Sequence, residues 1–226
     1  MLPFLSSLQL ADSLFPSGLY TLSHGLEAYA QADGFDVEML APLLTDLLQC
    51  GVGPSDGVAL ACAHRAATGG DLDLATRADR RLAAVKLVRE AREASRRTGR
   101  QLLSLSGEIV GGEILAAYAA RVKAGDAPGN HAVVLGLTMA ALAIPREQAI
   151  AGELYAFAAG CVAAAVRLAL IDHRRGQALL HNLRPVIAAV ACESGGKDVA
   201  DIASCAPLAE IMGMRHEAAE IRLFST

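Results

Sequence analysis

Histidine, cysteine and acidic residues are the side chains of this sequence that could do chemistry, and their spacing gives little support for catalysis. The six histidines are scattered, and no two lie three or four positions apart, so no single helix offers a histidine pair to a metal ion. No HExxH or paired CxxC pattern occurs, and without a predicted strand the chain offers no GxSxG nucleophile elbow. Gly195-Gly196-Lys197 is followed by Asp198, where a phosphate-binding loop carries Ser or Thr. We therefore expect neither enzyme activity nor a nucleotide site in this chain.

The cysteines and the first residues bear on the cellular location of the chain. The cysteine number is odd, no CxxC pair occurs, and the surroundings are apolar or helical, which is typical of reduced thiols in a cytosolic protein. The five are Cys50, Cys62, Cys161, Cys192 and Cys205. The opening MLPFLSSLQLAD has no Lys or Arg before its apolar run, unlike a signal peptide. These features favour a soluble cytoplasmic protein.

One segment carries an unusual charge. Residues 77–100 hold eight Arg and one Lys against three acidic residues, although the whole chain has a net charge of −4. The first interpretation is a solvated helix face with pairs such as Arg89 and Glu93, one turn apart. A second is a docking face for an acidic protein. A third is a helical nucleic-acid-binding regulator, which the missing aromatic residues and the acidic chain disfavour.

Helical spacing runs through the whole chain, without the alternation expected of strands. The most apolar stretch, Glu153–Asp172, has no charge from Leu154 to Val166, which is too short a run to span a bilayer. We expect it to be the central helix of a bundle, with Gly160 and Ala164 facing a close neighbour. The predicted fold class is all-α, with residues 1–226 forming a single domain.

Glycine and proline predict the element boundaries. Gly51-Val52-Gly53 is expected to be a turn between helices, with Pro54 starting the next helix. Asp71 or Asp73 is expected to cap one long helix that reaches Arg97, and Gly107 to separate shorter segments after it. The chain is 53% hydrophobic and only 4% aromatic, which predicts either a tight alanine-rich bundle or apolar surface that partners cover.

The two ends of the chain carry a resemblance to a known family. Residues 8–31, LQLADSLFPSGLYTLSHGLEAYAQ, resemble the opening of UreF-type urease accessory proteins, with matches at Asp12, Pro16, Gly18, Tyr20, Ser23, Gly25, Leu26 and Glu27. The similarity continues colinearly through residues 97–105, 131–145 and 154–168. It closes with MRHEAAEIRLF at residues 214–224. Many relatives differ at Leu19 and at His24, and the tail near Glu220 also varies.

The resemblance implies an all-helical, non-enzymatic chaperone that forms a homodimer. Such proteins bind a UreD/UreH-type accessory protein and a UreG-type GTPase, regulate GTP hydrolysis, and take part in nickel delivery to apo-urease. The nucleotide then belongs to the GTPase, and this chain has no firmly bound cofactor, only transient nickel.

The same resemblance, together with the residue types, selects candidate partner-binding residues. Tyr20, Leu22 and His24 follow a glycine turn that can project side chains outward, and Met, Arg and aromatic residues are enriched in interfaces. The candidates are Pro16, Gly18, Tyr20, Ser23, His24, Glu27, Met214, Arg215, His216, Glu217, Arg222, Leu223 and Phe224. The weak nickel candidates are His24, His216 and Glu217, since imidazole suits that ion. The alternative for the tail is that Leu223 and Phe224 dock on the bundle. We also expect the last dozen residues to be mobile alone and ordered in a complex.

Overall fold

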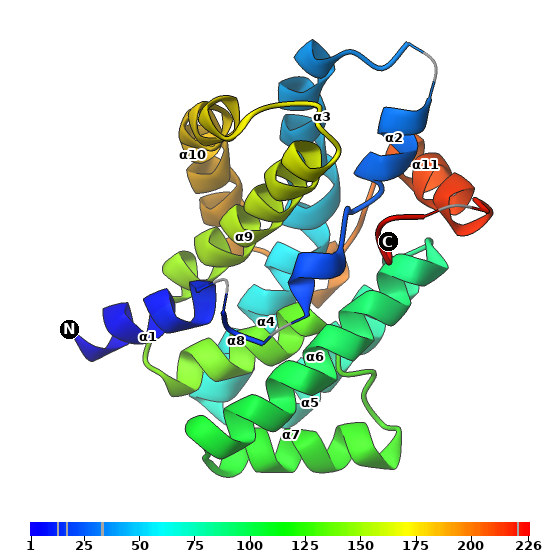
Figure 1. The fold of residues 1–226 in the computed structure, drawn as a ribbon. Helices are drawn as coiled ribbons and strands as arrows, with labels where there is room; N and C mark the ends of the chain where they lie inside the picture. The colour runs from blue at the N-terminus through cyan, green and yellow to red at the C-terminus, as the bar shows by residue number, and fades with distance from the viewer. Residues whose placement is uncertain (13, 17, 33, 221) are drawn as a thin grey trace.

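A computed structural model of the chain describes residues 1–12, 14–16, 18–32, 34–220 and 222–226. Helices account for all of its regular structure, and no strand occurs among the described residues, which confirms the all-α prediction. Figure 1 shows the helices gathered in one bundle, with the two ends of the chain on its surface.

The first half of the chain contains α1 (Leu2–Ala11), η1 (Leu19–Thr21), α2 (Leu26–Gln31), η2 (Val37–Met39), α3 (Leu40–Asp46), the π-helix η3 (Leu47–Gly57), α4 (Val58–Gly69), α5 (Leu72–Val85) and α6 (Arg89–Ile109). The second half contains α7 (Glu113–Ala124), α8 (His131–Ala141), α9 (Arg146–Arg167), α10 (His173–Gly195), η4 (Val199–Asp201) and α11 (Pro207–Glu217).

The most enclosed elements are α4 and α8, which cross at close range. Every residue of α8 from His131 to Met139 is buried. A Cβ on Gly136 of α8 would lie 2.5 Å from the carbonyl oxygen of Leu60 in α4, so the two backbones meet where glycine provides the space. The helix predicted to be central, α9, packs beside this pair but leaves Tyr155 43% exposed.

Helix α9 begins at Arg146, directly after Pro145, and is longer than its uncharged run. By length and composition it could cross a membrane, yet it packs against α10, α8 and α4 as a core helix does. Gly160 of α9 does not face a neighbouring helix as predicted. A Cβ on Gly160 would lie 3.5 Å from Nε2 of His24, so this glycine makes room for the N-terminal segment.

The predicted turn at Gly51-Val52-Gly53 is wrong, because the chain passes through it as the π-helix η3, which joins α3 and α4. A Cβ on Gly53 would lie 2.3 Å from Cγ1 of Val190 in α10, so Gly53 permits close packing rather than a turn. Pro54 lies inside this helix instead of starting one. Such π segments are rare and frequently occur at functional sites.

The single long helix expected from residue 71 to residue 97 is also wrong. The Asp71 cap is confirmed, since its carboxylate accepts a hydrogen bond from the Leu74 amide at 2.9 Å, but α5 ends at Val85 and α6 begins at Arg89. Arg92 donates at 2.6 Å to the carbonyl oxygens of both Lys86 and Leu87, which stabilises the break. Gly107 does not interrupt the chain, because α6 continues to Ile109.

Candidate partner-binding site at the joined chain ends

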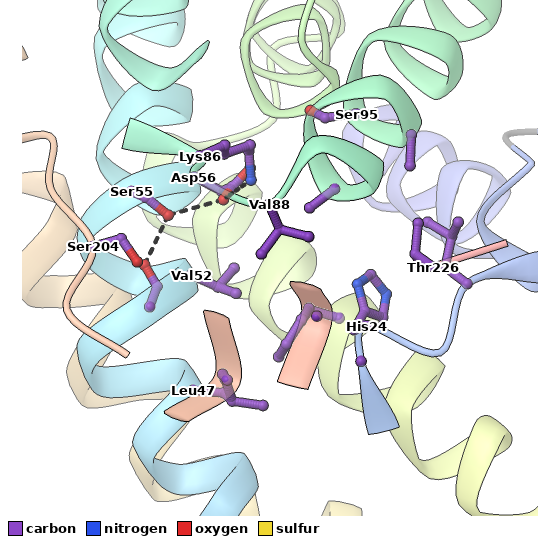
Figure 2. Close-up of a pocket in the computed structure, with 18 of the residues that line it drawn as sticks. His24, Leu47, Val52, Ser55, Asp56, Lys86, Val88, Ser95, Ser204 and Thr226 are labelled. Carbon is purple, nitrogen blue, oxygen red and sulfur yellow. Dashed lines mark hydrogen bonds and ion pairs between the residues drawn. The ribbon is translucent and has the colours of Figure 1, made fainter. Parts of the chain in front are cut away.

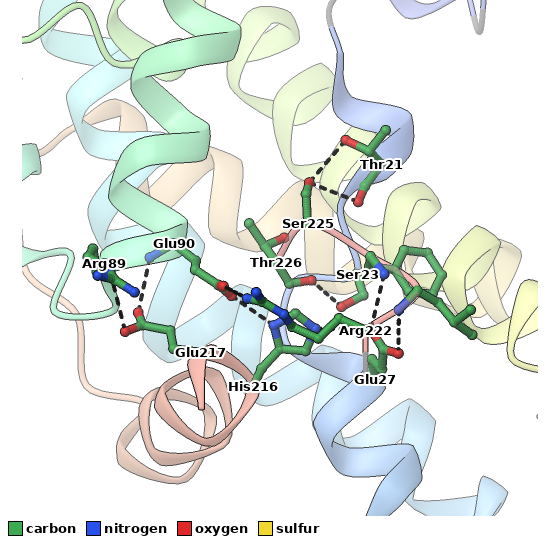
Figure 3. Close-up of polar contacts among 12 residues, drawn as sticks. Thr21, Ser23, Glu27, Arg89, Glu90, His216, Glu217, Arg222, Ser225 and Thr226 are labelled. Carbon is green, nitrogen blue, oxygen red and sulfur yellow. Dashed lines mark hydrogen bonds and ion pairs between the residues drawn. The ribbon is translucent and has the colours of Figure 1, made fainter. Parts of the chain in front are cut away.

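The two ends of the chain meet around a buried histidine. His216 of α11 lies between two carboxylates, with Nε2 3.0 Å from Glu27 of α2 and Nδ1 2.8 Å from Glu90 of α6 (Figure 3). The side chains of His216 and Glu27 are each 1% exposed. Only an imidazolium can donate to both carboxylates at once. We call Glu27, Glu90 and His216 the clasp, because they join three elements from distant parts of the sequence.

Glu27 also holds the backbone of the tail. Its two carboxylate oxygens accept hydrogen bonds from the amides of Leu223, at 2.9 Å, and Phe224, at 3.2 Å. Burial acts to raise the pKa of Glu27, but the Leu223 amide, the His216 ring and the Phe224 amide together outweigh it and lower the pKa below the ordinary value of 4.5. The carboxylate therefore stays ionised and fixes the tail to α2.

Further contacts fasten the last residues. The backbone and hydroxyl groups of Ser23 both bond to the carbonyl oxygen of Thr226, and the Ser225 amide donates to the Thr21 carbonyl at 3.0 Å. Arg222 pairs with the second oxygen of Glu90. Phe224 is buried, with the Arg167 guanidinium 4.3 Å from its ring centroid. Glu217 accepts a hydrogen bond from the Glu90 amide at the start of α6.

A cavity of about 210 Å³ lies next to the clasp (Figure 2). Its walls come from η3, from the Lys86–Val88 link between α5 and α6, from α9, and from both chain ends. Most of the wall area is apolar, and Leu47 and Val52 of η3 contribute to it. The cavity thus lies where two irregular elements meet: the break between α5 and α6, and the π-helix η3.

Ionisable groups cluster at one part of this cavity. Lys86 and Asp56 form an ion pair at 2.7 Å, and the Ser55 hydroxyl donates to the same carboxylate at 2.9 Å (Figure 2). Burial raises the pKa of Glu153, whose carboxylate lies 3.7 Å from Nε2 of His131. Nδ1 of His131 is buried without a hydrogen-bond partner. This part of the cavity provides polar groups that a bound molecule could contact.

His24 points into the cavity rather than toward solvent, which corrects the outward orientation expected for it. Its ring packs against Phe157 in a tilted arrangement, with the ring planes at 60° and the centroids 4.7 Å apart. Burial, followed by the nearby positive charge of Lys86, lowers the pKa of His24 to about 4, so the ring is neutral at physiological pH. Leu22 is buried as well, again contrary to expectation.

The structure divides the other predicted site residues into two groups. Four are buried and act inside the chain, where a partner cannot touch them in this conformation: Ser23, Glu27, His216 and Phe224. Six are exposed and available to a partner: Pro16, Gly18, Met214, Arg215, Arg222 and Leu223. Glu217 is half-buried, and the side chain of Tyr20 lies outside the described part. The docking alternative holds for Phe224, whereas Leu223 is 76% exposed.

The weak nickel candidates do not converge. Both ring nitrogens of His216 face carboxylates, Glu217 bonds to the start of α6, and His24 lies in the cavity. Across the described residues, no group of three His, Cys, Asp or Glu side chains is arranged to hold a metal ion.

Sequence reasoning missed several residues of this region. Glu90 lies within the basic segment and was treated as part of a solvated face, although it is one side of the clasp. Asp56, Lys86 and Glu153 carry no local motif that marks them. The one available signal was Pro54, which disfavours a regular helix next to the cavity-lining residues Ser55 and Asp56.

The basic segment is not a continuous stripe. It is divided between α5 and α6, and several of its arginines are engaged in the fold: Arg80 donates to the Asp126 carbonyl, Arg81 to the Ile202 carbonyl, and Arg92 to the link. These contacts give Arg80, Arg81 and Arg92 structural roles.

Comparison with known proteins gives consistent results along the chain. The family model described as UreF matches residues 35–184. Urease accessory protein UreF of Trichodesmium erythraeum is 30% identical over 222 residues, covering 98% of this chain and 96% of that protein. The UreF of Lachnoclostridium phytofermentans is 34% identical and covers 97% of both, and UreF 2 of Brucella canis is 32% identical over 96% of this chain and 89% of its own length.

The family model leaves out both chain ends, but the full-length relatives extend over them, so the joined ends belong to the shared region. The helical fold, the colinear sequence similarity and these matches agree, and the chain is a member of the UreF family of urease accessory proteins.

Proposed function

We propose that this chain is a non-enzymatic scaffold of urease maturation in the cytoplasm, which joins a UreD/UreH-type accessory protein to a UreG-type GTPase. The observation that supports it best is the joining of the two chain ends by the clasp. Glu27, Glu90 and His216 hold the N-terminal segment, α6 and α11 together, so the exposed residues of the tail and α11 lie on a surface that is fixed to the N-terminal segment. That surface combines Met214, Arg215, Arg222 and Leu223, a composition typical of interfaces.

A second exposed surface supports self-association. No residue of α1 is buried, and Met1, Leu2, Phe4, Leu5 and Leu8 are each more than half exposed. In Figure 1 this helix lies away from α11. Exposed apolar area of this kind marks interaction sites. We propose that a second copy of the chain or an accessory partner binds this surface.

Nickel is the proposed cargo of the assembly, and apo-urease its recipient. His24, His216 and Glu217 stay the candidate transient ligands on this chain, and the last two would first leave their present partners. Regulation of GTP hydrolysis would act through the GTPase, whose active site would hold the nucleotide.

Co-purification tests the scaffold proposal. The tagged chain is mixed with the UreD/UreH-type protein and the UreG-type GTPase, and the mass of the complex is measured by size-exclusion chromatography with light scattering. Met214→Ala combined with Leu223→Ala should weaken retention of the accessory protein at least ~10-fold, since exposed anchors contribute about 1–2 kcal/mol each. The matched control is Ile109→Ala, which removes an exposed apolar side chain from the far end of α6. Equal retention by the double variant and the control would refute this surface, and GTP hydrolysis by the purified chain alone would refute the scaffold role.

A further inference from the structure

A short extended segment before α11 lies along the π-helix η3. The Cys205 amide donates to the Cys50 carbonyl oxygen at 2.8 Å, and the Ala203 amide donates to the Pro54 carbonyl oxygen at 3.1 Å. Between them, Ser204 lies at the cavity beside Val52 and Ser55 (Figure 2). Two backbone hydrogen bonds one helical turn apart fix the register of this segment on η3.

The register brings two thiols together. Cys50 and Cys205 are both free and exposed. The Cys50 Cα lies about 2.4 Å from its carbonyl oxygen and the Cys205 Cα about 1.5 Å from its nitrogen, so the 2.8 Å hydrogen bond limits the Cα separation to about 6.7 Å. Disulfides join Cα atoms about 4.4–6.8 Å apart. The backbone separation is therefore within the disulfide limit, and bond formation requires the two side chains to rotate toward each other.

The remaining cysteines do not compete for this reaction. Cys62 and Cys161 are buried, and burial raises their pKa values to about 11 and about 12, which keeps them as unreactive thiols. Cys192 is exposed but lies on α10, and no backbone hydrogen bond of the described residues joins it to another cysteine.

We propose that Cys50 and Cys205 are a reversible oxidative modification site, which a peroxide converts to an intramolecular disulfide. One thiolate attacks the peroxide oxygen, giving a sulfenic acid and releasing water in the case of hydrogen peroxide. The second thiolate attacks that sulfur, the S–S bond forms, and a second water leaves. Two thiols are oxidised by two electrons and one peroxide is reduced. Cellular thiols reverse the step, so the resting form in a reducing compartment is the dithiol.

The disulfide would fix the start of α11 against η3 at the rim of the cavity. Gly51, Val52, Ser204 and Ala206 all line the cavity next to the two cysteines. Because α11 also carries His216, the oxidised form restricts the element that closes the clasp. We expect oxidation to raise the Tm by about 5 °C or more and to slow amide exchange in residues 203–206.

The test uses the full-length chain with all five cysteines reduced. The folded protein is treated with hydrogen peroxide, unreacted thiols are alkylated, and the products are mapped by mass spectrometry without reduction. The expected product is a monomer about 2 Da lighter before alkylation, with a peptide linking Cys50 to Cys205, and dithiothreitol restores the starting mass. Cys50→Ser and Cys205→Ser should abolish the link, whereas the matched control Cys192→Ser should keep it.

Oxidation in urea provides a second readout that does not depend on the folding of any variant. The unfolded wild-type chain should give scattered pairings, because nothing places the two residues together. The proposal is overturned if the folded chain gives the same scattered pairings, links Cys192 instead, or stops at separate sulfenic and sulfinic acids. An unchanged Tm of the linked form would overturn its effect on α11.

Discussion

Replacing Glu27 by glutamine tests the clasp with a minimal change, because only one carboxylate oxygen becomes an NH₂ group. Glu27 is 1% exposed, and its two oxygens accept three hydrogen bonds from His216, Leu223 and Phe224, besides a longer one of 3.4 Å from Gln31 of its own helix. A glutamine keeps one acceptor oxygen, and its NH₂ group faces at least one of the three donors. The variant thus loses a charge-assisted bond and leaves a buried N–H group unpaired.

The magnitude follows from these losses. A hydrogen bond to a charged group contributes about 1.5–3 kcal/mol, and an unsatisfied buried donor costs a further ~1–3 kcal/mol. We expect Glu27→Gln to lower the free energy of unfolding by about 3 kcal/mol, which corresponds to a Tm lower by about 6–12 °C in a chain of this size. Detachment of the tail limits the loss, because the remaining bundle can stay folded once residues 222–226 have left it.

Two measurements distinguish these outcomes. Thermal unfolding gives the Tm, and amide hydrogen exchange of residues 222–226 reports tail detachment, which should be faster in the variant. The matched control is Glu38→Gln, which neutralises an exposed carboxylate on η2. Because the folded pKa of Glu27 is lowered, its contribution is present above the ordinary value of 4.5 and is lost as the pH falls through the folded pKa. The difference in Tm between the wild type and Glu27→Gln should therefore disappear at acidic pH. Unchanged Tm and unchanged tail exchange in Glu27→Gln would show that the clasp does not hold the tail.

Other predictions address the cavity and the core. His24 has a pKa of about 4 in the folded chain, below its unfolded value of 6.5. The free energy of unfolding therefore has its full value above pH ~6.5 and decreases as the pH falls toward 4. Urea denaturation of the wild type and of His24→Asn should show that this decrease amounts to up to ~3 kcal/mol and is specific to the wild type. Asp79→Asn should cost about 2–4 kcal/mol, since the buried carboxylate accepts bonds from Tyr118, Gly129 and Asn130, while Tyr118→Phe should cost only about 1 kcal/mol; equal costs would contradict this. Gly136→Ala should lower the Tm, since its Cβ would meet the Leu60 carbonyl at 2.5 Å, whereas Gly107→Ala, with open space around it, should raise the Tm slightly.

The fold class and most helices could be predicted because apolar spacing is a local property. The wrong element boundaries arise where one sequence pattern is compatible with two different local structures. Gly51-Val52-Gly53 is compatible with a turn or with close packing, and only the position of Val190 in α10 decides for packing. At the break between α5 and α6, Lys86 pairs with Asp56, a partner supplied by another helix that local sequence does not reveal.

The candidate site shows the same limit. The resemblance selected both Glu27 and His216 as candidates, but it did not predict that they touch, since they are separated by 189 positions. It assigned them to partner contacts, because residue type alone does not distinguish an exposed anchor from a buried one. Their burial changes the expectation for substitutions: a change at Glu27 acts on partners through the placement of the tail, and a change at Leu223 acts through direct contact.

The joined ends make the two motifs of the chain one physical unit. Glu27 is in the N-terminal motif, yet it bonds to the backbone of residues 223 and 224 in the C-terminal motif. Ser23 likewise bonds to the last residue, Thr226. A substitution in either motif therefore displaces the other, and the exposed residues Met214 and Leu223 keep their relative positions only while the clasp is closed. Binding energies of Glu27→Gln and Leu223→Ala toward the accessory protein should consequently be non-additive: once the clasp is lost, removing the Leu223 side chain should weaken binding much less than it does in the wild type, and strict additivity would mean that the two ends bind independently.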